Sequence, residues 1–194
     1  MERTLRHALL LVGLTSLLAC AGVKPIDLAT EDPSSLPEDA AILVLEIDTE
    51  VRIGTLEISG VAATNHVVAK DLKEGKHLLF VSLRPGQYSW RMLKRYLGGT
   101  EYHWRLRREH DRMGFRVERG LLNYPGVLRV RRARYDRWLE IRNLNHAAQT
   151  RARLAREFPE LLEKFPIRYT GEDRDEFLER YEAALEMQVE RNMP

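Results

Sequence analysis

The chain has 194 residues with a formal net charge of +2, and 44% of its residues are hydrophobic. Its single cysteine excludes an internal disulfide, so the folded part must be held together by its own apolar core. The sequence contains no evident internal repeat or low-complexity tract.

Residues 1–19 have the pattern of an export signal. Arg3 and Arg6 make the start basic, and the apolar run of residues 8–18 follows. This run has the roughly 7–15 residues of a signal-peptide core and is shorter than the ~18–20 needed to cross a bilayer as a helix. We therefore predict a signal peptide and not a transmembrane anchor.

The cysteine comes directly after this signal, within Leu17-Leu18-Ala19-Cys20-Ala21-Gly22. This segment resembles the lipobox of bacterial lipoproteins, in which a small residue precedes the modified cysteine. The resemblance implies that Cys20 becomes the lipidated first residue of a membrane-anchored envelope protein, because two or more acyl chains hold a protein stably at a membrane. Alanine instead of aspartate after Cys20 implies sorting to the outer membrane, on the periplasmic side. The alternative is a chance cysteine after an ordinary signal peptide or inside a buried helix.

Residues 20–39 have the composition of an extended, lipidated tether. They are rich in Gly, Pro, Ser and acidic residues and poor in large apolar ones. The remainder from Ala40, about 155 residues, is long enough for one domain with a real core and an appendage. We expect a β-sandwich domain in residues 40–142 and a helical C-terminal extension in residues 143–194.

The first part of this domain has the pattern of short strands. Residues 41–48 are apolar and β-branched, residues 55–59 alternate, and residues 77–83 end at the turn signal Arg84-Pro85-Gly86. Short strands separated by turn residues at even spacing predict a mainly β fold, an antiparallel β-sandwich or an open barrel. Further strands are expected at residues 87–96, 102–108, 113–118, 127–132 and 138–142.

Two of these strands flank Gly98-Gly99 and alternate aromatic with basic residues. We expect a three-residue hairpin loop in which Tyr96 faces Tyr102 and Met92 faces Leu106, because a two-residue turn would set apolar residues opposite basic ones. This register predicts an aromatic face toward the core and a basic face toward solvent. The candidate binding residues on the basic face are Arg91, Arg95, Arg105 and Arg107.

Three segments carry a resemblance to a known module: residues 79–88, residues 115–120 and Asn123-Tyr124-Pro125-Gly126. They resemble prealbumin-like β-sandwich modules, related to carboxypeptidase-regulatory domains, in uncharacterised proteobacterial lipoproteins. In those modules a Pro-Gly turn and a following tyrosine open one strand, and a glycine with a nearby Tyr-x-Gly marks a later one. The resemblance implies a fold and no activity, since folds do not carry function by themselves.

After residue 143 the apolar period becomes that of a helix. Residues 147–158 and 161–165 keep helical spacing with an interruption at Pro159, and capping signals predict a final helix in residues 173–185. The start of that final helix is left open between Thr170-Gly-Glu-Asp173 and Asp173-Arg-Asp-Glu176, and its apolar face holds Phe177, Tyr181, Ala184 and Leu185. Each helix is amphipathic and needs a surface, which is the sandwich, a partner or the membrane.

The near-neutral total charge hides an uneven distribution. Residues 84–142 hold sixteen Lys or Arg against six Asp or Glu, whereas residues 20–83 hold five against eleven. The basic segment fits phosphate groups of lipopolysaccharide, anionic lipid or another acidic envelope polymer; nucleic acid is not expected as a partner of an exported lipoprotein. The alternative is neutralisation within the fold by the acidic first segment and by the acidic final helix, and we expect that helix to cover the basic face.

The residues form no evident catalytic constellation. No histidines have metal-ligand spacing, and Glu109-His110-Asp111 falls in a charged turn. No serine lies in a nucleophile-elbow motif, and no Gly-rich phosphate loop precedes a helix. We therefore predict no catalytic residue, no metal ligand and no cofactor.

These patterns together predict a membrane-anchored cell-envelope lipoprotein that acts as a non-enzymatic binding or assembly module. Its expected partners are the membrane, through the lipid anchor, and an envelope protein or an anionic envelope polymer. The alternative is an envelope hydrolase or sugar-modifying enzyme with a dispersed active site, which a deep cleft of convergent ionisable residues with perturbed pKa values would indicate.

Overall fold

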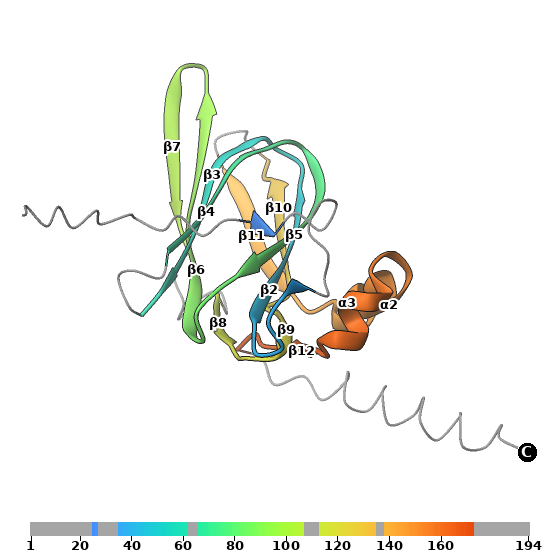
Figure 1. Ribbon diagram of the computed structural model, residues 1–194. Helices are drawn as coiled ribbons and strands as arrows, with labels where there is room; N and C mark the ends of the chain where they lie inside the picture. The colour runs from blue at the N-terminus through green and yellow to red at the C-terminus, as the bar shows by residue number, and fades with distance from the viewer. Residues whose placement is uncertain (1–24, 27–34, 62–65, 107–112, 135–137, 173–194) are drawn as a thin grey trace, which may run out of the picture.

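A computed structural model describes residues 25–26, 35–61, 66–106, 113–134 and 138–172. In this part of the chain the protein is mainly β, with two sheets and two short helices (Figure 1). The expectation of a mainly β fold is therefore confirmed.

Sheet A is the seven-stranded sheet on which the helices lie, and sheet B is the five-stranded sheet. The strands of sheet A are β1 (Pro25–Ile26), β2 (Ala41–Thr49), β5 (Gly75–Ser82), β9 (Leu121–Tyr124), β10 (Val127–Arg132), β11 (Leu139–Leu144) and β12 (Ile167–Tyr169). The strands of sheet B are β3 (Ile53–Gly60), β4 (His66–Leu72), β6 (Gly86–Leu97), β7 (Thr100–Arg105) and β8 (Gly114–Val117). The helices are α2 (Ala147–Glu157) and α3 (Pro159–Lys164).

Strand β2 lies in the middle of sheet A and has partners along both edges. β5 pairs with it antiparallel, whereas β9 and β10 pair with it parallel along the opposite edge. Parallel neighbours need a long crossover connection, and here all five strands of sheet B lie between β2 and β9 in the chain. The expectation of purely antiparallel strands is therefore wrong for sheet A.

Strand β2 is buried on both faces. Leu43 and Leu45 belong to the hydrophobic cluster shared with sheet B, and Ile42 and Val44 belong to a second cluster shared with the helices. Because successive side chains point to opposite faces, a strand between two apolar layers needs a continuous apolar run. This explains why residues 41–45 are apolar without alternation.

The larger cluster joins the two sheets. Trp90 of β6 is fully buried there, with its ring centroid 6.0 Å from that of Phe115 on β8. Tyr88 stacks on the same phenylalanine, with the ring centroids 6.0 Å apart. Aromatic side chains of this size contribute much of the apolar area that stabilises a core. The first residues of β6 are thus anchored in the interior.

The helices cover the face of sheet A that is turned away from sheet B (Figure 1). Leu154 of α2 and Leu161 of α3 are fully buried in the second cluster, and Phe158 between the helices packs edge-on against Phe80 at 5.3 Å. Helix α2 lies within the span predicted at residues 147–158, α3 begins at Pro159 and overlaps the span predicted at 161–165, and the β domain is the surface on which both lie.

The C-terminal extension is not wholly helical. β11 ends at Leu144, and β12 follows the helices and pairs with β9, which places Ile167 opposite Leu122. The predicted final helix at residues 173–185 lies outside the described residues. At the other end, Pro25–Ile26 of the expected tether pairs with β5, and Cys20 and the signal segment are also outside the described part of the chain.

Candidate functional site

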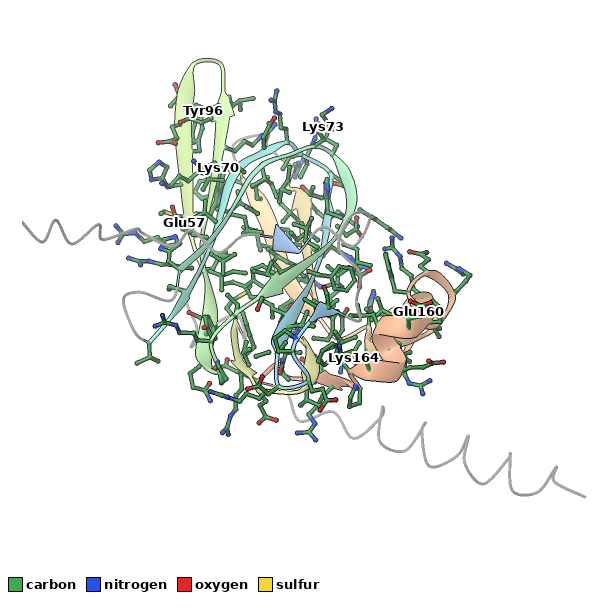
Figure 2. All side chains as sticks on the ribbon, in the orientation of Figure 1. Glu57, Lys70, Lys73, Tyr96, Glu160 and Lys164 are labelled. Atoms are coloured by element: carbon green, nitrogen blue, oxygen red, sulfur yellow. The ribbon has the colours of Figure 1, made fainter. Side chains whose placement is uncertain are left out.

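The side of sheet B that is turned away from sheet A, called here the outer face, carries polar side chains on three adjacent strands. Leu56 and Leu93 point into the shared core, so their chain neighbours point outward. Figure 2 labels Glu57 on the body of this sheet and Tyr96 on the hairpin. The outer-face residues of β3, β6 and β7 are Thr55, Glu57, Met92, Lys94, Tyr96, Glu101, His103 and Arg105.

A β-bulge in β6 decides which residues face outward. Ile58 of β3 lies opposite Trp90, and its neighbour Glu57 lies opposite Met92. Arg91 is therefore an extra residue on β6, and such a residue bends and twists its strand. The alternation changes phase at this point, so Trp90 and the residue three positions later both point into the core.

Beyond the bulge, β6 and β7 form a hairpin that projects from the body of the protein (Figure 1). Its turn is Gly98-Gly99, with φ angles of +57° and +82°. Two consecutive positive φ values are those of a type I′ turn, which closes a two-residue hairpin loop and matches the twist of the strands. The expected three-residue loop is therefore wrong.

The register of the hairpin differs accordingly from the expectation. Tyr96 lies opposite Glu101 and not opposite Tyr102, and Met92 lies opposite Arg105. The prediction assumed unbroken alternation along β6, and on that assumption an odd loop was needed to keep apolar residues together. The bulge supplies the odd residue within the strand, so the turn itself has the ordinary even length.

The first acid–base pair of the outer face is Lys94 with Glu57. The Lys94 Nζ lies 3.1 Å from Glu57 Oε1, and the two side chains are only 24% and 11% exposed. The hydrogen bond to Glu57 raises the pKa of Lys94 above its usual value. The pair thus places a fixed positive and a fixed negative charge at the base of the hairpin.

The second group is centred on Glu101 of β7. The His103 Nε2 lies 2.6 Å from Glu101 Oε2, and Tyr96 donates a hydrogen bond to the same carboxylate. The hydrogen bond with His103 and then that from Tyr96 lower the pKa of Glu101, and the carboxylate raises the pKa of Tyr96. Tyr96 nevertheless remains 65% exposed, so its ring is held in place while open to solvent.

The four arginines predicted to form one basic face do not share it. Arg91 is exposed at the bulge, and Arg105 is exposed on the outer face. Arg95 points inward beside Tyr102 and is buried, because the phase change at the bulge reverses its side; its place on the solvent face is therefore wrong. Arg107 lies outside the described residues.

Acidic residues of the first segment, residues 20–83, pair with the basic side chains of β10. This agrees with the alternative that the basic charges are neutralised within the fold. Asp48 of β2 accepts hydrogen bonds from both terminal nitrogens of Arg131, at 2.5 and 3.2 Å, and this guanidinium lowers the pKa of Asp48. Arg132 donates to Glu74 at 3.1 Å. The contribution expected from the acidic final helix lies outside the described residues.

A carboxylate that sequence reasoning missed lies between sheet A and α2. Glu46 Oε2 accepts hydrogen bonds from Tyr124 Oη at 3.1 Å and from Thr150 Oγ1 at 2.7 Å. Burial raises the pKa of Tyr124, and the nearby negative charge adds to the effect. The signal in the sequence was one acidic residue at an inward position of an apolar strand.

An open groove of about 620 Å³ lies beside the start of β6. Its charged lining residues are paired: Arg116 Nε lies 3.3 Å from Glu118, and Arg119 lies 2.7 Å from Asp39. Glu118 also pairs with Arg168 at 2.8 Å. The charges of this groove therefore neutralise one another.

Within the described ranges, no three His, Cys, Asp or Glu side chains come together as metal ligands, and no helix is both long and apolar enough to span a membrane. Glu109-His110-Asp111 lies outside these ranges.

No protein-family model matches the chain, and no curated protein or solved structure matches it either.

Proposed function

We propose that this protein is a cell-envelope lipoprotein, anchored through Cys20 at the outer membrane on the periplasmic side. Its β-rich domain is a β-sandwich of the prealbumin-like type that acts as a non-enzymatic binding or assembly module. The lipobox-like segment supports the anchor, and the turn-and-strand segments around Pro85-Gly86 and Pro125-Gly126 support the module. The partner is an envelope protein or an anionic envelope polymer.

The binding surface in this proposal is the outer face of sheet B. One observation carries it: Tyr96 stands 65% exposed on a projecting hairpin, although it is fixed by Glu101 and flanked by the Lys94–Glu57 pair. Exposed tyrosine with ordered polar neighbours is the usual composition of a protein recognition surface, since its ring gives a large contact area at low entropic cost.

Lipidation is tested by labelling cells with palmitate. The wild-type chain should take up label and Cys20→Ser should not, because the thiol is the acceptor. Equal labelling of both chains would contradict the anchor.

The binding surface is tested by photo-crosslinking in intact cells. A benzoylphenylalanine placed at Tyr96 should give defined adducts with other envelope components. The matched control is the same substitution at Trp138, which is equally exposed at 66% but lies beside β11 in sheet A. Identical adducts at both positions, or none at position 96, would contradict this choice of surface.

A further inference from the structure

Strand β7 is an edge of sheet B, since it pairs with β6 and with no other described strand. The backbone N–H of Leu106 donates to the carbonyl of Arg91, which marks this pair as a hydrogen-bonded one. Such pairs alternate along an antiparallel ladder. Tyr102 and Trp104 therefore bond to β6, and the backbone groups of the intervening residues point away from the sheet.

The residues with outward-pointing backbone are Glu101, His103 and Arg105. In the described part of the chain no backbone hydrogen bond to these groups is found. Their side chains all lie on the outer face, and Arg105 forms no ion pair with any described residue. An edge with a row of free N–H and C=O groups is a template for another strand.

The segment Glu101-Tyr102-His103-Trp104-Arg105 is complementary to a second, antiparallel copy of itself. Around His103 as the centre, an acidic residue stands at one end and a basic residue at the other, with an aromatic residue on each side. Tyr102 and Trp104 lie on the inward side of the hairpin, with ring centroids 6.1 Å apart, and both remain partly exposed.

We propose that two copies of this chain pair antiparallel through β7 about a two-fold axis at His103. Glu101 then lies directly opposite Arg105 of the second copy, twice by symmetry, and Tyr102 lies opposite Trp104 of the second copy on the other face. Opposite charges and aromatic pairs are the cross-strand contacts that stabilise an antiparallel ladder. The result is a sheet that continues through both molecules, an inference that goes beyond the proposed function and needs no other envelope component.

Charge selects this register over its neighbours. Pairing centred on Glu101 sets two carboxylates opposite each other, and pairing centred on Arg105 sets two guanidinium groups opposite each other, both of which destabilise the ladder. Centres at Tyr102 and Trp104 also set free backbone groups opposite one another, but they place His103 opposite Glu101 or Arg105 and so lose the two Glu101–Arg105 pairs. His103 is thus the centre at which charge, aromatic contact and backbone hydrogen bonding all agree.

A disulfide at the axis tests the geometry. In the full chain carrying Cys20→Ser, His103→Cys introduces a sole cysteine whose Cα should lie about 5.5 Å from that of its symmetry mate, a separation that a disulfide spans. Mild oxidation should convert most of the protein to a covalent dimer. The matched control is Lys70→Cys, which is exposed on the same face but on the opposite edge strand β4. Equal crosslinking of the two variants, or none at position 103, would overturn the proposal.

Charge exchange tests the register in the purified full chain with Cys20→Ser, by sedimentation in detergent. Glu101→Arg and Arg105→Glu should each weaken self-association about tenfold or more, since two attractive pairs become repulsive. Mixing the two variants should restore a heterodimer, and the double variant should restore a homodimer. Circular dichroism verifies that each variant is folded. A monomeric wild type, or single variants that associate like the wild type, would overturn the pairing.

Discussion

The outer faces of the two sheets contain the same small motif in opposite surroundings. On sheet A, Glu46 accepts hydrogen bonds from a tyrosine and a threonine beneath α2. On sheet B, Glu101 accepts from Tyr96 and lies against His103 in solvent. The comparison shows that a carboxylate with two donors fixes a helix to a sheet when it is covered, whereas in water it only arranges a surface.

The reason is the cost of leaving a donor unsatisfied. Tyr124 and Thr150 are almost entirely buried, so their hydroxyls lose water on folding and need the Glu46 carboxylate. Tyr96 can exchange its partner for water at little cost because it is mostly exposed. The first cluster therefore contributes to stability, and the second is free to serve recognition.

The largest expected difference between the two faces is the loss of unfolding free energy when an apolar side chain is truncated. Leu154→Ala on the buried side of α2 should lower the free energy of unfolding by about 2–5 kcal/mol, because the surrounding core relaxes only partly around the vacated space. Val68→Ala on sheet B, where the side chain is 40% exposed, should change it by no more than about 0.5 kcal/mol. Urea titrations of both variants measure the two values. Similar losses would mean that the outer face of sheet B is covered as well.

The second-largest expected difference is the stability effect of neutralising the two carboxylates, Glu46 and Glu101. Glu46→Gln should lower the free energy of unfolding by about 1–3 kcal/mol, because a charged acceptor of two buried hydroxyls becomes a neutral one. The matched change Glu101→Gln should shift the urea midpoint much less, because the exposed partners of Glu101 can bond to water instead. A shift of the midpoint by Glu101→Gln as large as that by Glu46→Gln would show that the hairpin cluster also has a structural role.

The smallest effect concerns proton binding. The pKa of Glu101 lies below its ordinary value of 4.5 in the folded chain, owing first to His103 and then to Tyr96. A depressed pKa means that these contacts stabilise the hairpin above about pH 4.5 and lose their effect as the pH falls through the folded-state value. A carboxyl NMR titration should show the pKa of Glu101 rising toward 4.5 in His103→Gln. An unchanged titration would assign the shift to another cause.

Periodicity predicted most elements of the fold. The run at residues 41–48 became β2, and the helical spacing after residue 147 became α2 and α3. Four strands escaped prediction, and β1 and β12 did so because segments of two and three residues are too short to show a period. β4 alternates weakly because its outward positions are exposed on an edge, and β9 is four residues long with its pattern set by a parallel neighbour.

The candidate site was predicted only in part, although its hairpin was expected. Arg105 does lie on the outer face, but Arg95 does not, and the acidic partners Glu57 and Glu101 were not foreseen. Such pairings depend on which residues of different strands lie opposite each other, and Arg91, which has no partner on β3, changes every pairing with β3 beyond it. No local property of the sequence predicts which residue forms the β-bulge.

The bulge at Arg91 also determines what the deletion of a single codon would do to the hairpin. Removing that single codon would restore regular alternation from Trp90 onward and leave the inward and outward residues of the hairpin as they are. What would change is the bend of β6, and with it the direction in which the hairpin leaves the body. Deletion of one codon would therefore change the direction of the hairpin while the same residues stay on its surface.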